Sequence, residues 1–328
     1  MTKPDTSKAA SAPSITVSGE QAGLTLAALV RELVPGTSWS KARDLCRTGR
    51  VAVDGEIAVD SARRMVEGER VQIRTEGGGA EQRGPTVTSL VLHLDADVVV
   101  VHKPAGILTV PFERTDRDTL LALTRVAVRR IEAGRGGPQG PTLRAVQRLD
   151  KETSGVVVFA RTITAQRNLQ EQLAARTVTR RYLAIVHGKT EDAVYDTLLV
   201  SDRGDGLRGS WGVFRQARTE APETARQAIT RVRVEKGLAG ATLVGCELET
   251  GRQHQIRIHL AEADHPLLGE NVYIRDYQGP VIPAPRPMLH ASVLGFVHPR
   301  TGKGLRFEDP PPADFNAVLE RLQTRRRR

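Results

Sequence analysis

A short polar segment leads directly into a continuous apolar run, and this junction constrains the fold more than any other feature of the chain. Residues Arg148–Gly155 read RLDKETSG, so the carboxylate of Asp150 lies in sequence between two cations, Arg148 and Lys151. The run Val156–Ala160 that follows has the length and composition of a buried strand. A carboxylate at the mouth of such a strand is either a catalytic group on a rigid scaffold or a side chain that caps a turn.

Four further segments accompany this motif in a recognisable order. They are Val101–Ile107 (VHKPAGI), Arg181–Gly188 (RYLAIVHG), Leu248–Leu260 (LETGRQHQIRIHL) and Leu289–Pro299. Together with RLDKETSG they resemble the motifs of the RluA family of RNA pseudouridine synthases, and they extend over residues 98 to about 312. The chain departs from the family pattern at Gln147, where histidine is usual. Glutamine keeps a hydrogen-bonding side chain but cannot titrate.

The resemblance implies three catalytic residues. Asp150 is expected to act on the ribose of a uridine, either as a nucleophile or as a base. Arg257 is expected to lie beside it, because a close cation favours the ionised form of a carboxylate. Tyr182 is expected to stack on the target uracil, a contact worth about 1–3 kcal/mol per base. The alternative for Arg257 is a strand residue that pairs with a surface acid. The alternative for Tyr182 is an ordinary aromatic residue of the core.

The same resemblance implies contacts with RNA. Arg148 is expected to fill the space that the extruded target nucleotide leaves, although a phosphate-contacting or solvated arginine is an equal alternative. Lys103 is expected to support the active-site loop or to meet a phosphate, and Arg252 is expected to contact RNA. His254 and His259 lie five apart in an expected strand, where they would point to opposite faces and hold no metal.

The first quarter of the chain predicts a small RNA-binding domain. Residues 1–22 lack periodic apolar positions and are expected to form a disordered leader. Residues 23–75 predict helices at 24–34 and 41–48, then a hairpin with an Asp-Gly turn. This order resembles an S4 RNA-binding domain. The basic residues expected to contact phosphates are Arg43, Arg47, Arg50, Arg63 and Arg64, with a solvated surface charge as the alternative for each.

The remaining chain predicts one large domain. Residues 76–89 contain several glycines and are expected to form a flexible linker. Residues 90–312 are the expected pseudouridine synthase domain, and residues 313–328 a C-terminal helix and basic tail. Many β-branched runs and few helices, at 119–132 and 165–173, favour an α+β fold with a mixed, mainly antiparallel sheet and flanking helices. Residues 201–225 are polar and glycine-rich, as expected of a surface insertion.

Charge and composition restrict the partners. The chain has 48 Lys and Arg against 38 Asp and Glu, a formal charge of +10, which favours nucleic acid or an acidic membrane. No apolar run is long enough to cross a membrane, and the N-terminus lacks a secretory signal, so a cytoplasmic protein is expected. The two cysteines are expected to be reduced. No zinc-ligand spacing, GxGxxG or P-loop occurs, so neither a metal nor a cofactor is expected.

Three functions remain open at this point. An S4 domain is typical of family members that act on large-subunit ribosomal RNA, so this RNA is the expected substrate. The same chemistry on tRNA is an alternative, and a non-catalytic RNA-binding ribosome-assembly factor is another. The resemblance suggests a monomer.

Overall fold

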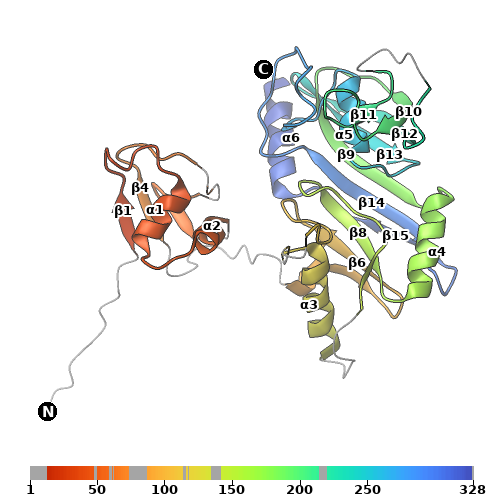
Figure 1. The fold of residues 1–328 in the computed structure, drawn as a ribbon, viewed down its shortest axis with the longest axis horizontal. Coiled ribbons are helices and arrows are strands. Elements are labelled where there is room, and N and C mark those ends of the chain that lie inside the picture. Colours follow the sequence, from red (N-terminus) through yellow and green to blue (C-terminus); the bar gives the residue numbers. More distant parts are fainter. Residues whose placement is uncertain are drawn as a thin grey trace. The chain divides into compact units, whose positions relative to one another are not determined.

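The computed structural model describes residues 13–326, apart from 48–49, 59–60, 62, 74–86, 114–115, 117, 134–141 and 214–219. The chain divides into two compact units, Met1–Gly84 and Pro85–Arg328 (Figure 1). Each unit has its own hydrophobic core. None of the helices in the described ranges is long and apolar enough to span a bilayer.

The small unit combines two helices with a four-stranded antiparallel sheet. The helices are α1 (Leu26–Leu33) and α2 (Trp39–Arg47), and Thr25 caps α1 by accepting a hydrogen bond from the N–H of Ala28. The strands are β1 (Ser14–Thr16), β2 (Val51–Val53), β3 (Glu56–Ile57) and β4 (Arg70–Ile73), in the order β1-β4-β2-β3. Asp54 and Gly55 have φ values of 51° and 86°, as a two-residue hairpin turn requires. The predicted hairpin is confirmed.

The predicted leader is wrong at its C-terminal end. Strand β1 pairs with β4 from Ser14 to Thr16, and Val17 is buried in the core of the small unit. The alternation of Ile15 and Val17 with polar neighbours therefore marks an edge strand. Residues 1–12 and most of the predicted linker lie outside the described residues, while the 3₁₀ helix η1 (Val87–Leu90) occupies the end of that linker.

The large unit is built on one eleven-stranded sheet. Its order is β11-β10-β12-β13-β9-β14-β8-β6-β5, with β15 paired to β14 and β7 to β8. The strands are β5 (Val91–Leu94), β6 (Val98–Lys103), β7 (Arg144–Ala145), β8 (Ser154–Ala160), β9 (Thr179–His187), β10 (Ala193–Val200), β11 (Gly209–Ser210), β12 (Arg226–Gly237), β13 (Ala241–Leu248), β14 (Leu289–Val297) and β15 (Gly304–Glu308). Among these strands only β8 and β14 pair in parallel, so the predicted mixed, mainly antiparallel sheet is confirmed.

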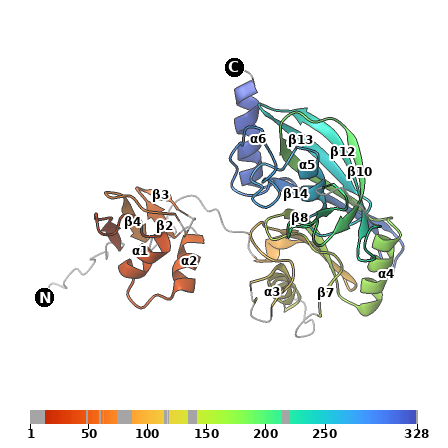
Figure 2. The ribbon, with the colours of Figure 1, turned by 45° about the horizontal axis from the view of Figure 1, so that its top comes forward.

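Helices cover both faces of this sheet (Figure 2). Helices α3 (Leu120–Ala133) and α5 (Gln255–Glu262) pack on one face, against alternate residues of β6, β8 and β9. Helices α4 (Ile163–Ala174) and α6 (Ala313–Arg326) pack on the other face. Because side chains of a strand alternate between faces, the even-numbered residues of β9 from Tyr182 to Val186 face α5, and Ile185 faces α6.

One glycine allows β8 and β14 to approach. Gly155 has φ of +125°, and a Cβ atom there would lie 2.3 Å from the carbonyl oxygen of Ala291. Both the backbone conformation and the space therefore require glycine. The loop that carries Asp150 enters the sheet at this close contact.

Candidate active site

The main chain around Asp150 is held by buried side chains from three other segments. Lys103 at the end of β6 donates from Nζ to the carbonyls of Lys151 at 2.9 Å and Thr153 at 2.7 Å. Thr109 donates to the carbonyl of Leu149 at 2.8 Å and accepts its N–H at 3.0 Å. Arg286 donates to the carbonyl of Glu152 at 3.0 Å. The loop on both sides of the carboxylate is thereby fixed.

The prediction that Lys103 contacts RNA is corrected by its burial. Its side chain is 0% exposed, and Nζ also donates to the carbonyl of Pro104 at 3.3 Å. Three carbonyl acceptors match the three hydrogens of an ammonium group. Burial lowers the pKa of Lys103 to about 7, although the nearby carboxylates of Glu152 and Asp150 oppose the shift. The other predicted role, support of the Asp150 loop, agrees with these contacts.

Arg257 lies beside Asp150, as predicted, but on a helix. Its Nη1 is 3.7 Å from Asp150 Oδ2. Its Nε and Nη2 donate to the two oxygens of Glu270 at 2.8 and 2.7 Å, and the Glu270 side chain is fully buried. Burial alone would raise the pKa of Glu270, but the hydrogen bonds and charge of Arg257 hold it below its usual value. Glu270 therefore fixes the guanidinium that faces Asp150.

The segment predicted as a strand with His254 and His259 is wrong in its secondary structure. Residues Gln255–Glu262 form α5, and His254 is its N-cap residue in the left-handed region, with φ of 58°. The side chains of the two histidines nevertheless lie in different surroundings. His254 Nε2 lies 3.9 Å from Asp150 Oδ1, whereas His259 is buried between hydroxyls of Thr197 and Thr230 at 3.0 and 2.8 Å.

His254 and Tyr273 complete the surroundings of the carboxylate. Tyr273 Oη lies 2.7 Å from His254 Nδ1, and burial raises the pKa of Tyr273 to about 12. A protonated hydroxyl donates to Nδ1 and leaves the ring hydrogen on Nε2, toward Asp150. Burial also lowers the pKa of His254, so the ring stays neutral at neutral pH. The sequence singled out neither Glu270 nor Tyr273, and His254 carried only its place in the motif as a signal.

Tyr182 lies on β9, on the face of the sheet that α5 covers. Its side chain is 8% exposed, and burial raises its pKa to about 12, with a smaller contribution from the charge of Asp150. It pairs across the strands with Cys246 and Ala291, next to the β8–β14 contact. The hydroxyl is therefore protonated at neutral pH and lies within electrostatic range of the carboxylate.

The other predicted RNA-contacting residues lie at the surface where their side chains are described. Arg148 and Arg252 are exposed in the large unit, and Gln147 is half-buried. Arg43 and Arg50 are exposed in the small unit. Arg47 ends α2, and its side chain lies outside the described part.

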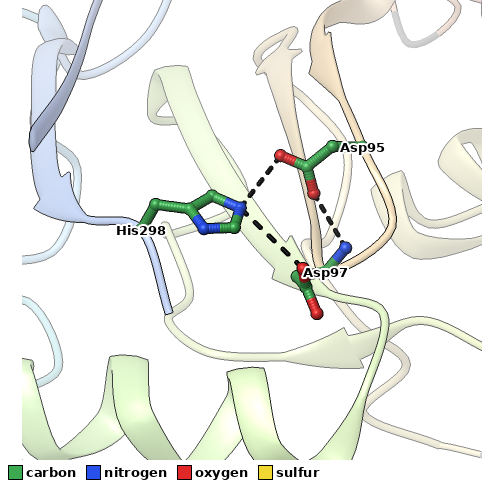
Figure 3. Close-up of side chains that lie close together, drawn as sticks. All are labelled: Asp95, Asp97 and His298. Carbon is green, nitrogen blue, oxygen red and sulfur yellow. Dashed lines mark hydrogen bonds and ion pairs between the residues drawn. The ribbon is translucent and has the colours of Figure 1, made fainter. Parts of the chain in front are cut away.

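A separate cluster joins Asp95, Asp97 and His298 (Figure 3). It lies at the opposite end of β8 from Asp150, because Val98 pairs with Ala160 while Lys103 pairs with Gly155. His298 Nδ1 accepts the N–H groups of Arg300 and Thr301 at 3.2 and 3.1 Å, so the ring hydrogen is on Nε2 and points to Asp95 Oδ2 at 3.1 Å. Nε2 then has no lone pair for a cation, and the cluster ties β14 to the β5–β6 turn.

Comparison with known proteins identifies the family. Residues 97–262 match the model for RNA pseudouridylate synthase. A ribosomal large subunit pseudouridine synthase D from Nitrosomonas europaea is 34% identical, over 98% of this chain and 92% of the relative. The uncharacterized RNA pseudouridine synthase YlyB of Bacillus subtilis is 32% identical, over 94% of this chain and 97% of the relative. The chain belongs to the RNA pseudouridine synthase family, which confirms the resemblance found in the sequence.

A solved structure supports the same fold. Human RNA pseudouridylate synthase domain containing 4 superposes with a TM-score of 0.57 at 23% identity, covering 72% of this chain and 94% of the human chain. An α+β architecture with a mixed sheet is therefore shared with a family structure.

Replacing Lys103 tests the support of the Asp150 loop. Lys103→Met removes the donor for three main-chain carbonyls, and each buried unsatisfied acceptor costs about 1–3 kcal/mol. We expect a lower free energy of unfolding in urea and slower turnover. Lys151→Met, a change at an exposed lysine of the same loop, should leave stability within about 0.5 kcal/mol. Equal stability of the two variants would contradict this role.

Low pH should destabilise the packing of α5 around the buried His259. Burial lowers the pKa of His259 to about 4, from an ordinary value of 6.5. Since the folded pKa is depressed, the unfolded chain binds more protons between these values, and stability falls as pH falls from 6.5 to 4. The expected loss is about 3 kcal/mol. Unfolding curves across this range for the native chain and His259→Gln should differ in slope, and parallel pH profiles would contradict the assignment.

Proposed function

We propose that the chain isomerises specific uridines to pseudouridine in large-subunit ribosomal RNA, with Asp150 as the catalytic carboxylate. The observation that carries the proposal is the Asp150–Arg257 pair. The carboxylate is 25% exposed, and a buried guanidinium faces it 3.7 Å away. The names of curated relatives, including that of Nitrosomonas europaea, support ribosomal RNA as the substrate.

The reaction needs no redox partner. The bond from N1 of uracil to C1′ of the ribose breaks, the base turns, and a bond from C5 to C1′ forms. N1 gains a proton and C5 loses one, so the product is an isomer of the substrate. Asp150 would act on the ribose as a nucleophile or a base, and either role requires a carboxylate, which the buried guanidinium of Arg257 faces.

In this proposal Tyr182 contacts the target base and Arg148 fills the position that the base leaves. Tyr182 would contact the uracil that has left its stack, from a fixed position on β9. Arg148 is exposed two residues before the carboxylate, where its long side chain can occupy the vacated position. Extrusion of the base costs a few kcal/mol, which such contacts offset.

We further infer that the small unit is an S4-like RNA-binding module. Its helix–helix–hairpin order and the exposed Arg43 and Arg50 support this inference. Phosphate contacts supply much of the affinity of proteins for nucleic acids without reading sequence. The module would thus hold the substrate while the large unit performs the chemistry.

Asp150→Asn tests the catalytic assignment. The amide has nearly the same shape but cannot ionise, so we expect loss of tritium release from RNA labelled with [5-³H]uridine. RNA affinity should remain within about threefold, because phosphate contacts dominate binding. Turnover is measured separately on large-subunit ribosomal RNA, free and in partly assembled particles, and on tRNA transcripts.

The matched control is Glu152→Gln, which removes a carboxylate from the same loop. It should retain turnover. Persistent release by Asp150→Asn would remove Asp150 from its role, and release from tRNA alone would replace the proposed substrate.

Arg43→Gln combined with Arg50→Gln tests the small unit. Loss of two phosphate contacts should weaken RNA binding and reduce the slope of log K against log salt by about 1.4, if the contacted strand is single. Titrations at several salt concentrations measure the slope. Arg167→Gln, on the exposed surface of α4, provides the control for loss of a positive charge. A double-variant slope no smaller than that of the control would argue against an RNA-binding module.

A further inference from the structure

A basic pocket lies beside the active site, between the end of β10, the start of β12 and the N-terminus of α5. These elements gather in one region of the large unit in both views (Figures 1 and 2). The cavity measures about 190 Å³, and the apolar side chains that line it, Leu199, Val200 and Ile258, are buried. The polar residues that line it are Ser201, Arg208, Thr224, Arg226, Arg252 and Gln253.

The lining of this pocket selects for an anion. Each of these six polar side chains carries a hydrogen-bond donor, three of them are guanidinium groups, and no carboxylate lines the cavity among the described residues. Among the described residues, Arg226 and Arg252 donate to main-chain carbonyls, those of Glu223, Ala225 and Gln227. Within the described ranges, no acidic side chain forms an ion pair with any of the three arginines. None of these three guanidinium groups therefore has a carboxylate partner in the part of the chain that the structure describes.

The segment that carries Arg208 is held in place. Glu262 of α5 accepts the N–H of Ser210 at 2.8 Å and its hydroxyl at 2.5 Å. On the other side, the N–H of Arg203 donates to the carbonyl of Leu207 at 2.7 Å. Arg208 itself is half-buried between these two anchors. A cation fixed before its ligand arrives loses less conformational entropy on binding.

The pocket lies close to the carboxylate of Asp150, because adjacent residues of the chain contact the two. Gln253 lines the pocket, and the next residue, His254, places Nε2 3.9 Å from Asp150 Oδ1. Consecutive Cα atoms are only about 3.8 Å apart. Burial is the main cause of the lowered pKa of His254, and the charges of Arg257 and Arg208 act in the same direction. Arg208 therefore lies within electrostatic range of the active site.

We propose that this pocket binds a backbone phosphate of the nucleotide next to the uridine in the active site. The inference rests on the proposed function, because the ribose of the target must lie at Asp150. Guanidinium groups suit phosphate oxygens, and the buried apolar side chains suit the adjoining ribose. The cavity is well below the roughly 300–1,000 Å³ of small-molecule sites, which suits a single phosphate group better than a larger ligand.

The test measures RNA binding without turnover. Arg208→Gln and Arg226→Gln are each made in the Asp150→Asn chain, and dissociation constants for large-subunit ribosomal RNA are measured over a series of salt concentrations. Each variant should bind several-fold more weakly, with a slope of log K against log salt reduced by about 0.7 for a single-stranded phosphate contact. Arg208→Lys should restore most of the slope, since it keeps the charge.

Arg167→Gln is the control, because it removes one exposed positive charge from α4, on the opposite face of the sheet. Pocket variants that match this control in affinity and slope would overturn the proposal. Thermal unfolding checks that Arg208→Gln folds. If this variant does not fold, Arg226→Gln tests the proposal, because Arg226 is exposed and its replacement should not disturb folding. Binding is measured in the Asp150→Asn chain, so failure of the catalytic proposal would appear separately, as missing tritium release by the native chain or as persistent release by Asp150→Asn.

Discussion

The close parallel contact between β8 and β14 is the constraint on which the position of Asp150 depends. Gly155 lets the two main chains meet where any Cβ atom would overlap Ala291. Directly beside it, Ser154 Oγ lies 3.0 Å from Nδ1 of His290, and both residues are fully buried. The loop that ends in this contact cannot shift along the sheet without breaking it. The main chain thus sets the position of the Asp150 carboxylate. Lys103 stabilises that main chain by donating to the carbonyls of Lys151 and Thr153.

The buried Arg257–Glu270 pair has a geometric purpose more than a stabilising one. Moving two charges out of water costs several kcal/mol, and their attraction often does no more than offset that cost. Glu270 occupies Nε and Nη2, so Nη1 is the nitrogen that faces Asp150. At 3.7 Å this nitrogen lies beyond hydrogen-bond distance of the carboxylate, so it leaves the carboxylate oxygens free for the ribose of the proposed reaction. A direct hydrogen bond would hold the carboxylate more firmly but would compete with the substrate.

The sequence predicts the site better than the elements that support it. Asp150, Arg257 and Tyr182 each lie in a short motif that resembles the family pattern. That resemblance predicted that the three residues belong to one site. The segment that contains His254 and His259 was predicted as a strand. In fact all residues from Gln255 to Leu260 are buried, so helix α5 lacks the amphipathic pattern that marks a surface helix. Glu270 and the burial of Lys103 could not be predicted, since each depends on partners distant in sequence. Strand β1 was missed although Ile15 and Val17 alternate with polar neighbours, because the strand that it pairs with, β4, is distant in sequence.

Charge links catalysis to RNA binding in the proposed complex. A carboxylate that works beside a phosphodiester is repelled by it, and two unit charges 4 Å apart near a protein surface interact by about 4 kcal/mol. Such repulsion opposes the approach of the RNA to the carboxylate. Arg257 compensates for Asp150 before RNA arrives, but Glu270 already neutralises part of its charge. The three arginines of the neighbouring pocket have no such carboxylate partner among the described residues. They can therefore cancel the charge that the RNA brings, which reduces the repulsion between the RNA and Asp150.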